Sequence, residues 1–272
     1  MPNAFLAARA VADVRALFRE QLDYRELLLQ MVRRDLLLRY KQTVMGFGWA
    51  LFMPLINTVI FSIVFTRVAP IDTGMPYPLY AYCGLLAWNF MASSLRFAVT
   101  SLTSNANLVT KIYFPREIFP FAAVLVGLVD TAIGSSVLIG LMAWYGVWGG
   151  WPMLLLPIVV LVHVMFTAGL ALLLAMANLF FRDVKYLFDV LVSVAMFATS
   201  VVYPIERVGG WTGRILALNP LNAIIDAYRA VLLTGTLPAA GPLAMAAGFS
   251  VVLLLGAWMV FHRGELTFAE NI

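Results

Sequence analysis

Long apolar blocks alternate with short polar segments along most of this chain. Six such blocks are found, at residues 48–66, 77–99, 118–146, 153–181, 187–202 and 241–261. A helix needs about 20 residues to cross a hydrocarbon layer about 30 Å thick, so the pattern predicts six membrane-spanning helices. The block at 187–202 is short, and we expect it to borrow flanking residues or to end inside the bundle. The predicted fold is an all-α integral membrane protein with a single domain over residues 1–272.

A helix that does not span is predicted over residues 10–42. Val14, Leu17 and Leu22 recur at helical spacing, and bases dominate the polar side. This pattern is typical of an amphipathic helix lying on the inner leaflet. A soluble helical hairpin packed on a partner protein is the alternative.

A second short helix is predicted over residues 104–116, because Pro115 disfavours helix at the residue before it. Such a helix would display an aliphatic and aromatic cluster outside the bilayer, which is costly unless something covers it. The loop therefore either folds back onto the bundle or docks another subunit. The candidate docking residues are Lys111, Ile112, Tyr113, Phe114, Arg116 and Glu117.

The segment 204–235 is predicted to carry short external helices. Asn219 can cap a helix that Gly235 ends, and at about 1.5 Å per residue this helix is too short to span. We expect it to dip into the outer leaflet, with Asn222, Asp226 and Arg229 on its wetter side. Asp226 and Arg229 lie three residues apart and are expected to pair.

Composition supports a membrane protein. With 62% hydrophobic residues, 12% charged residues and a mean hydropathy of +0.91, the chain has more apolar surface than a soluble domain could bury. The single cysteine, Cys83, excludes an internal disulfide and a multi-cysteine metal site, and no metal site is predicted. We expect no removable signal peptide, because residues 1–20 contain no uninterrupted apolar core followed by a cleavage site.

The distribution of charge predicts the orientation. With both termini in the cytoplasm, fourteen of the 18 lysines and arginines lie inside and four lie outside: Arg67, Arg207, Arg214 and Arg229. The pI near 9.3 does not indicate nucleic acid, because the bases concentrate beside membrane entry points. Membrane lipids or a lipid-linked phosphate are the expected counter-charges.

Four of these bases precede the first span: Arg33, Arg34, Arg39 and Lys41. They either grip a lipid-linked diphosphate, which suits the forked donors of arginine, or only anchor the helix on anionic lipid.

Five segments, taken in order, carry a family resemblance: RRDLLLRYKQTVMGFGWALFMPL, LLAWNFMASSL, SNANLVTKIYFPREIFP, NLFFRDVKYL and NPLNAIIDAYRAVLLTG. Together they resemble the permease subunit of type-2 ATP-binding-cassette exporters, in the branch that exports bacterial polysaccharides such as O antigen, capsule and teichoic acid. The resemblance implies a homodimer in the bacterial inner membrane, carried by two copies of a separate ATPase. A lipid-linked glycan would pass between the two subunits. Residues 10–42 would be the interface helix, 104–116 the coupling helix and 204–235 the external gate helices.

The sequence also indicates that this chain is not the ATP-hydrolysing subunit. Its lysines are Lys41, Lys111 and Lys185, and none is preceded by Gly or followed by Ser or Thr, so there is no phosphate-cradling P-loop. We therefore expect no catalytic residues and no cofactor in this chain, with ATP and Mg bound by the partner ATPase. A separate motor also favours docking at residues 111–114.

The family resemblance implies that two of the spans surround the substrate path. Their aromatic residues are therefore candidates for it: Trp49, Phe52, Tyr186, Phe188 and Phe197. Rings can stack on the apolar faces of sugars without a fixed hydrogen-bond pattern, which suits a sliding polymer. The alternative is that they face lipid or pack in the core.

The sequence pattern also fits other functions. The same fold could export a drug or a small lipid. An integral-membrane glycosyl or acyl transferase would need an acidic pair or a histidine–acid cluster at one membrane face, and the sequence indicates none. Asp130, inside the third span, is expected to form interhelical hydrogen bonds, and His163 to be structural.

Overall fold

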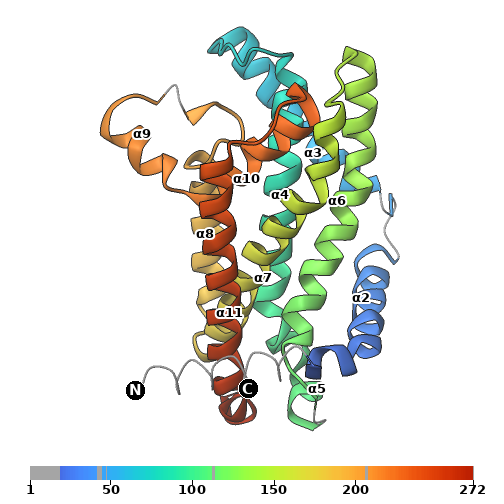
Figure 1. The fold of residues 1–272 in the computed structure, drawn as a ribbon. Helices are drawn as coiled ribbons and strands as arrows, with labels where there is room; N and C mark the ends of the chain where they lie inside the picture. The colour runs from blue at the N-terminus through green and yellow to red at the C-terminus, as the bar shows by residue number, and fades with distance from the viewer. Residues whose placement is uncertain (1–18, 42–44, 47, 112–113, 206–207, 272) are drawn as a thin grey trace.

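The computed structural model describes residues 19–41, 45–46, 48–111, 114–205 and 208–271 (Figure 1). Its regular elements are helical throughout the described residues. In chain order they are α2 (Arg25–Tyr40), α3 (Gly48–Ile63), η1 (Val64–Val68), α4 (Tyr77–Ser101), η2 (Thr103–Asn105), α5 (Ala106–Lys111), α6 (Ile118–Tyr145), η3 (Trp151–Leu155), α7 (Leu156–Phe180), α8 (Val184–Phe197), α9 (Gly210–Ala217), α10 (Pro220–Arg229), η5 (Ala230–Thr234) and α11 (Ala240–Asn271).

Each of the six predicted spans coincides with a helix, which confirms the all-α class. Four stretches are long and apolar enough to cross a membrane: Leu51–Val68, Ile118–Tyr145, Trp151–Phe180 and Ala240–Glu265. A fifth is possible by the same criteria if Gly210–Ala217 and Pro220–Thr234, bent by 81°, count as one. The chain is therefore a multi-pass membrane protein.

Helix α8 has 14 residues, about 21 Å of helix, so it is short for a bilayer, as the sequence indicated.

Helix α4 is long enough to span but too polar to be among the four apolar stretches. It is the most enclosed helix of the bundle, lying among α3, α6, α7, α8 and α10 (Figure 1), and most of its side chains are buried. Its polar groups find partners there: the Tyr77 hydroxyl donates to the Val202 carbonyl at 2.8 Å, and the Tyr82 hydroxyl donates to the Gly134 carbonyl at 2.9 Å. Because neighbouring helices shield α4 from lipid, it can carry tyrosine, serine and asparagine.

Helix α11 continues well beyond the predicted end at residue 261. Phe261 and Phe268 are fully buried in a cluster that also contains Phe114 and Phe119, at the end of the bundle where α5 lies. These rings keep the last turns of α11 packed on α7 and on the start of α6. The extension brings polar residues of α11 close to the segment before α6.

The N-terminal element differs from the prediction. A turn at Tyr24 separates the helical residues 19–23 from α2, so one continuous helix over 10–42 is wrong; residues 10–18 and 42 lie outside the described residues. Helix α2 stands alongside α6 (Figure 1), where Val32 is buried against Ala122 and Val126. Apolar packing on the bundle therefore holds α2.

The chain then turns before α3. Gly46 has a φ of +52°, a backbone conformation that glycine adopts without steric cost, and α3 begins at Gly48. The basic helix and the first span are therefore separate elements, in agreement with their separate predicted ranges.

Candidate functional site

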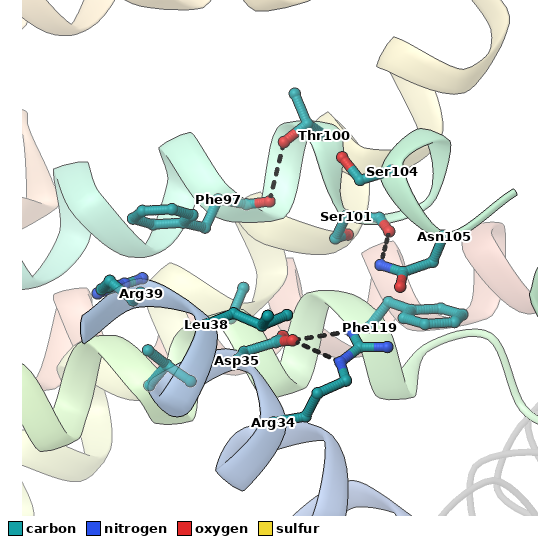
Figure 2. Close-up of a pocket in the computed structure, with 12 residues that line it drawn as sticks. Arg34, Asp35, Leu38, Arg39, Phe97, Thr100, Ser101, Ser104, Asn105 and Phe119 are labelled. Atoms are coloured by element: carbon teal, nitrogen blue, oxygen red, sulfur yellow. Dashed lines mark hydrogen bonds and ion pairs between the residues drawn. The ribbon is translucent and has the colours of Figure 1, made fainter. Parts of the chain in front are cut away.

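A cavity of about 390 Å³ lies between α2, the end of α4 with η2, and the first turns of α6 (Figure 2). Helix α2 supplies two arginines and a carboxylate, and the end of α4 with η2 supplies hydroxyl and amide groups. The lining residues are Arg34, Asp35, Leu38, Arg39, Phe97, Thr100, Ser101, Ser104, Asn105, Phe119, Ala123 and Val126.

Arg34 lies at the rim of this cavity. Its Nε and Nη2 donate to Oδ1 of Asp35 at 2.9 and 2.8 Å, and about a third of each side chain is exposed. A guanidinium carries five N–H donors, so the pair with Asp35 leaves donors for an oxygen-rich ligand. Exposure to water makes the pair itself worth little to stability.

Arg39 lies deeper. It donates to Oδ2 of Asp130, and its guanidinium stacks 3.7 Å from the centre of the Phe97 ring. The Tyr40 hydroxyl donates to the other oxygen of Asp130 at 2.6 Å. Burial raises the pKa of Tyr40 to about 12, so this hydroxyl keeps its proton at neutral pH. The prediction that Asp130 forms interhelical hydrogen bonds is confirmed, with α2 as the partner helix.

A second cavity, of about 260 Å³, lies beyond the Arg39–Asp130 pair. Its lining is Trp49, Met53, Pro54, Asn57, Leu86, Asn89, Phe90, Ser93, Arg96, Asp130 and Thr131. Because Arg39 lines the first cavity and Asp130 the second, the ion pair lies between the two.

A third cavity, of about 350 Å³, shares Thr100 and Ser104 with the first and is lined on its other side by Asn178, Arg182 and Lys185. Asn178 is buried, and its Oδ1 accepts no hydrogen bond from the described residues. Two cavities with polar lining residues therefore lie next to the end of α4.

The four bases that are candidates for the diphosphate do not all line one cavity. Arg34 and Arg39 line the first cavity, whereas Arg33 and Lys41 are exposed and do not. Successive residues of a helix point about 100° apart, so Arg33 turns away from the face that carries Arg34.

The aromatic residues predicted to line the substrate path also lie in different surroundings. Trp49 and Phe52 contact each other with ring centres 5.9 Å apart, and Trp49 lines the second cavity. Tyr186 and Phe197 are exposed on α8. Phe188 is buried in the main core, on the face of α8 that packs against the bundle, which favours the alternative that this ring packs in the core.

Of the four docking candidates that the structure describes, three are turned inward. Lys111 is exposed, and Ile112 and Tyr113 lie outside the described residues. Phe114 is 5% exposed and packs on Phe119 with ring centres 5.5 Å apart, so its predicted display is wrong.

Arg116 and Glu117 contact α11 instead of solvent. Arg116 donates from its guanidinium to the Glu265 carbonyl, and Glu117 is 1% exposed beside His262. Their prediction as displayed docking residues fails because the long α11 covers them. The prediction that no histidine–acid cluster forms on this face is also wrong, since Glu117, His262 and Glu265 meet here.

The external segment keeps its predicted helix but not its predicted wet face. The Asn219 side chain accepts from the Leu221 amide at 3.0 Å, and Gly235 ends the element with a φ of +64°, as expected. Asn222 and Arg229 are each 5% exposed, so their placement on a wet side is wrong, whereas Asp226 is exposed.

The predicted pair of Asp226 and Arg229 forms, with Nη1 to Oδ1 at 3.0 Å. Arg229 also stacks 3.6 Å from the Tyr80 ring centre and donates to the Val201 carbonyl at 2.8 Å. The guanidinium therefore joins α10 to α4 and to the segment after α8, which a surface pair would not do.

Sequence reasoning missed the polar lining supplied by α4. Asn89, Ser93 and Arg96 recur at three- and four-residue spacing, which places them on one helical face, and this periodicity could have revealed them. Thr100 and Ser104 continue towards the first cavity.

Comparison with known proteins identifies the family. Residues 26–233 match the family model of the ABC-2 type transporter. The chain is 33% identical over 259 residues to the O-antigen export system permease protein RfbA of Myxococcus xanthus, covering 94% of this chain and 99% of that protein. It is 27% identical over 219 residues to the RfbA permease of Klebsiella pneumoniae, covering 78% of this chain and 82% of that protein. The match to the family model spans well over half of the chain, which therefore belongs to the ABC-2 type transporter family.

Proposed function

We propose that this chain is the membrane subunit of an ATP-driven exporter that moves lipid-linked O-antigen polysaccharide across the bacterial inner membrane. The observation that carries the proposal is the arginine-bearing cavity between α2, α4 and α6, in a chain whose relatives over nearly its whole length are O-antigen export permeases. We assign this cavity to the diphosphate of the lipid carrier. Arg34 offers free donors at its rim, while hydroxyl and amide groups face it from α4 and η2.

The proposed topology has six spans and both termini in the cytoplasm. The two spans that composition alone does not identify are α4, which its neighbours shield from lipid, and the short α8. The fourteen-to-four distribution of bases supports this orientation. The first and third cavities then open towards the cytoplasm, where a lipid-linked precursor would be recognised.

The proposed assembly contains two copies of this chain and two copies of a separate ATPase that binds ATP and Mg. Large apolar side chains of α3 and α8 are exposed, which supports a second copy or lipid on these faces: Phe52, Met53, Ile56, Val59, Ile60, Tyr186, Leu187, Val190, Leu191, Val194 and Phe197. The ATPase would dock at the end that carries α5 and Lys111, where residues 104–116 act as the coupling helix. The segment 204–235 would form the external gate.

The alternative functions are not favoured. The relatives are named as export permeases, which argues against a transferase, and their O-antigen systems argue for a glycan over a drug or small lipid.

The test is substitution at Arg34. Arg34→Gln should lower surface O-antigen and substrate-stimulated ATPase activity at least tenfold while membrane insertion and basal ATPase activity persist. Arg34→Lys should recover only part of the loss, because lysine cannot match the two-point contact of a guanidinium with phosphate.

Arg33→Gln is the matched control, since it removes the neighbouring charge from the same helix without touching the cavity. Equal tolerance of Arg33→Gln and Arg34→Gln would show that these bases only anchor α2.

A further inference from the structure

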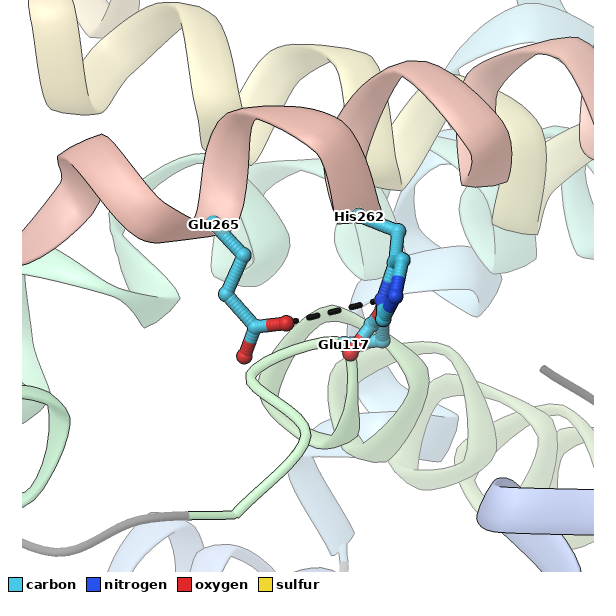
Figure 3. Close-up of side chains that lie close together, drawn as sticks. All are labelled: Glu117, His262 and Glu265. Carbon is cyan, nitrogen blue, oxygen red and sulfur yellow. Dashed lines mark hydrogen bonds and ion pairs between the residues drawn. The ribbon is translucent and has the colours of Figure 1, made fainter. Parts of the chain in front are cut away.

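Three side chains that can bind a metal ion meet where α11 reaches the start of α6: Glu117, His262 and Glu265 (Figure 3). One ligand atom from each lies within 4.8 Å of the others. Nδ1 of His262 is 3.1 Å from Oε1 of Glu117 and 3.5 Å from Oε2 of Glu265. Residues 145 positions apart in the chain thus point their ligand atoms at one another.

Glu117 has a buried carboxylate oxygen without a hydrogen-bond partner in the described part of the chain. Its side chain is 2% exposed, and its Oε2 has no hydrogen-bond partner among the described residues. A buried carboxylate oxygen without a partner is costly, so this position favours a cation beside it.

The described protein groups near the cluster leave Oε2 of Glu117 without a partner. The Arg116 amide donates to Oε1 of Glu265 at 3.0 Å, and its guanidinium Nε is 3.9 Å from the same oxygen, so Arg116 serves Glu265. His262 faces both carboxylates through one nitrogen, which carries at most one proton.

We propose that Glu117, His262 and Glu265 form a binding site for a divalent transition-metal cation of the Zn²⁺ class. One imidazole nitrogen with two carboxylate oxygens is a donor set that such ions use, whereas Mg²⁺ and Ca²⁺ prefer oxygen ligands alone. With bonds of about 2.0–2.2 Å, ligand atoms around a tetrahedral ion lie about 3.3–3.5 Å apart. The separations of 3.1 and 3.5 Å at Nδ1 are close to that spacing.

The site is accessible to an ion from solution, because 43% of the His262 side chain is exposed. Such an ion would tie the first turn of α6 to α11, directly after the loop that carries Phe114 and Arg116. Its expected role is to strengthen the contact between α6 and α11, which already pack through Phe121 and Trp258 with ring centres 5.1 Å apart.

The experiment measures binding of Zn²⁺ itself to the full chain, purified in detergent without a polyhistidine tag. Equilibrium dialysis followed by metal analysis should give one Zn²⁺ per chain, and the melting temperature should rise with free Zn²⁺ concentration. Glu117→Gln and His262→Gln should each lower the affinity at least tenfold. Asp189→Asn is the control, because it removes an exposed carboxylate from an ion pair with Arg96, remote in sequence from the cluster, and should leave binding unchanged.

His262→Gln decides the matter if Glu117→Gln fails to fold, since His262 is partly exposed and the change conserves polarity. Co²⁺, as a probe, should give the visible absorption of a tetrahedral complex in the unsubstituted chain and lose it in His262→Gln. Sub-stoichiometric Zn²⁺ binding by the unsubstituted chain, or equal binding by all four proteins, would overturn the proposal and leave the cluster as an ion-pair network.

Discussion

At the scale of single residues, the Asp130 carboxylate inside the bundle takes its partners from another helix. Asp130 lies well inside α6, yet Arg39 and Tyr40 of α2 donate to both of its oxygens, and each charged side chain is only 16% exposed. A carboxylate and a guanidinium with so little water need each other. The pair therefore determines where α2 can lie along α6.

We predict that Asp130→Leu alone will destabilise the protein by about 3 kcal/mol, because it leaves the Arg39 charge without its carboxylate. The double substitution Arg39→Met with Asp130→Leu should recover most of that loss. Thermal unfolding in detergent measures both. Full recovery of stability without recovery of export would assign Arg39 or Asp130 a role in transport, whereas no recovery would show that the pair is not the source of the effect.

A second prediction concerns Phe114, whose ring is buried against Phe119. Phe114→Ala should lower the free energy of unfolding by about 3 kcal/mol or more, as expected for removing a buried ring. Lys111→Ala, at an exposed position of the same segment, should leave stability unchanged. A Phe114→Ala variant of normal stability that uncouples ATP hydrolysis would instead restore the ring to the role of a docking anchor.

At the scale of elements, α4 organises the bundle through close backbone contacts. A Cβ added at Gly84 would lie 2.2 Å from the Val201 carbonyl oxygen and 2.5 Å from Nη2 of Arg229. The absence of a side chain at this position lets the segment after α8 and the buried Arg229 approach α4. The external helices are thus held to the bundle by packing as well as by hydrogen bonds.

Gly84→Ala should therefore destabilise the protein by about 2 kcal/mol through overpacking. Gly140→Ala in α6 is the matched control, because nothing lies within 4 Å of its added Cβ. It should be neutral or stabilise by up to about 1 kcal/mol through helix propensity. Melting temperatures compare the two, and equal effects would show that the close approach at Gly84 is unimportant.

At the scale of the whole molecule, the proposed topology has six crossing helices with both termini in the cytoplasm. Reporter fusions after residues 75, 149 and 237 should read external, and fusions after 112, 184 and 272 should read cytoplasmic, because of the charge bias and the positions of the six helices. An external signal from the fusion at residue 112 would overturn the orientation and the cytoplasmic assignment of the cavities.

The sequence alone determined the helical class, the six helix positions, the caps at Asn219 and Gly235 and the Asp226–Arg229 pair. These features depend on local periodicity, block length and residues close in sequence, which the chain carries without folding. The polar face of α4 was also visible in the sequence as the helical spacing of Asn89, Ser93 and Arg96, although the sequence-based prediction missed it.

Only the tertiary structure decided which side chains are available. It buried Phe188, Phe114 and Arg229, and it directed Arg34 into the first cavity while Arg33 points away from it. It also extended α11 far enough to bring His262 and Glu265 next to Glu117. Burial and pairing of this kind depend on which face of each helix meets another and on contacts between residues far apart in the chain. Helical spacing can show that a face is polar or apolar, but it does not state which neighbour covers that face.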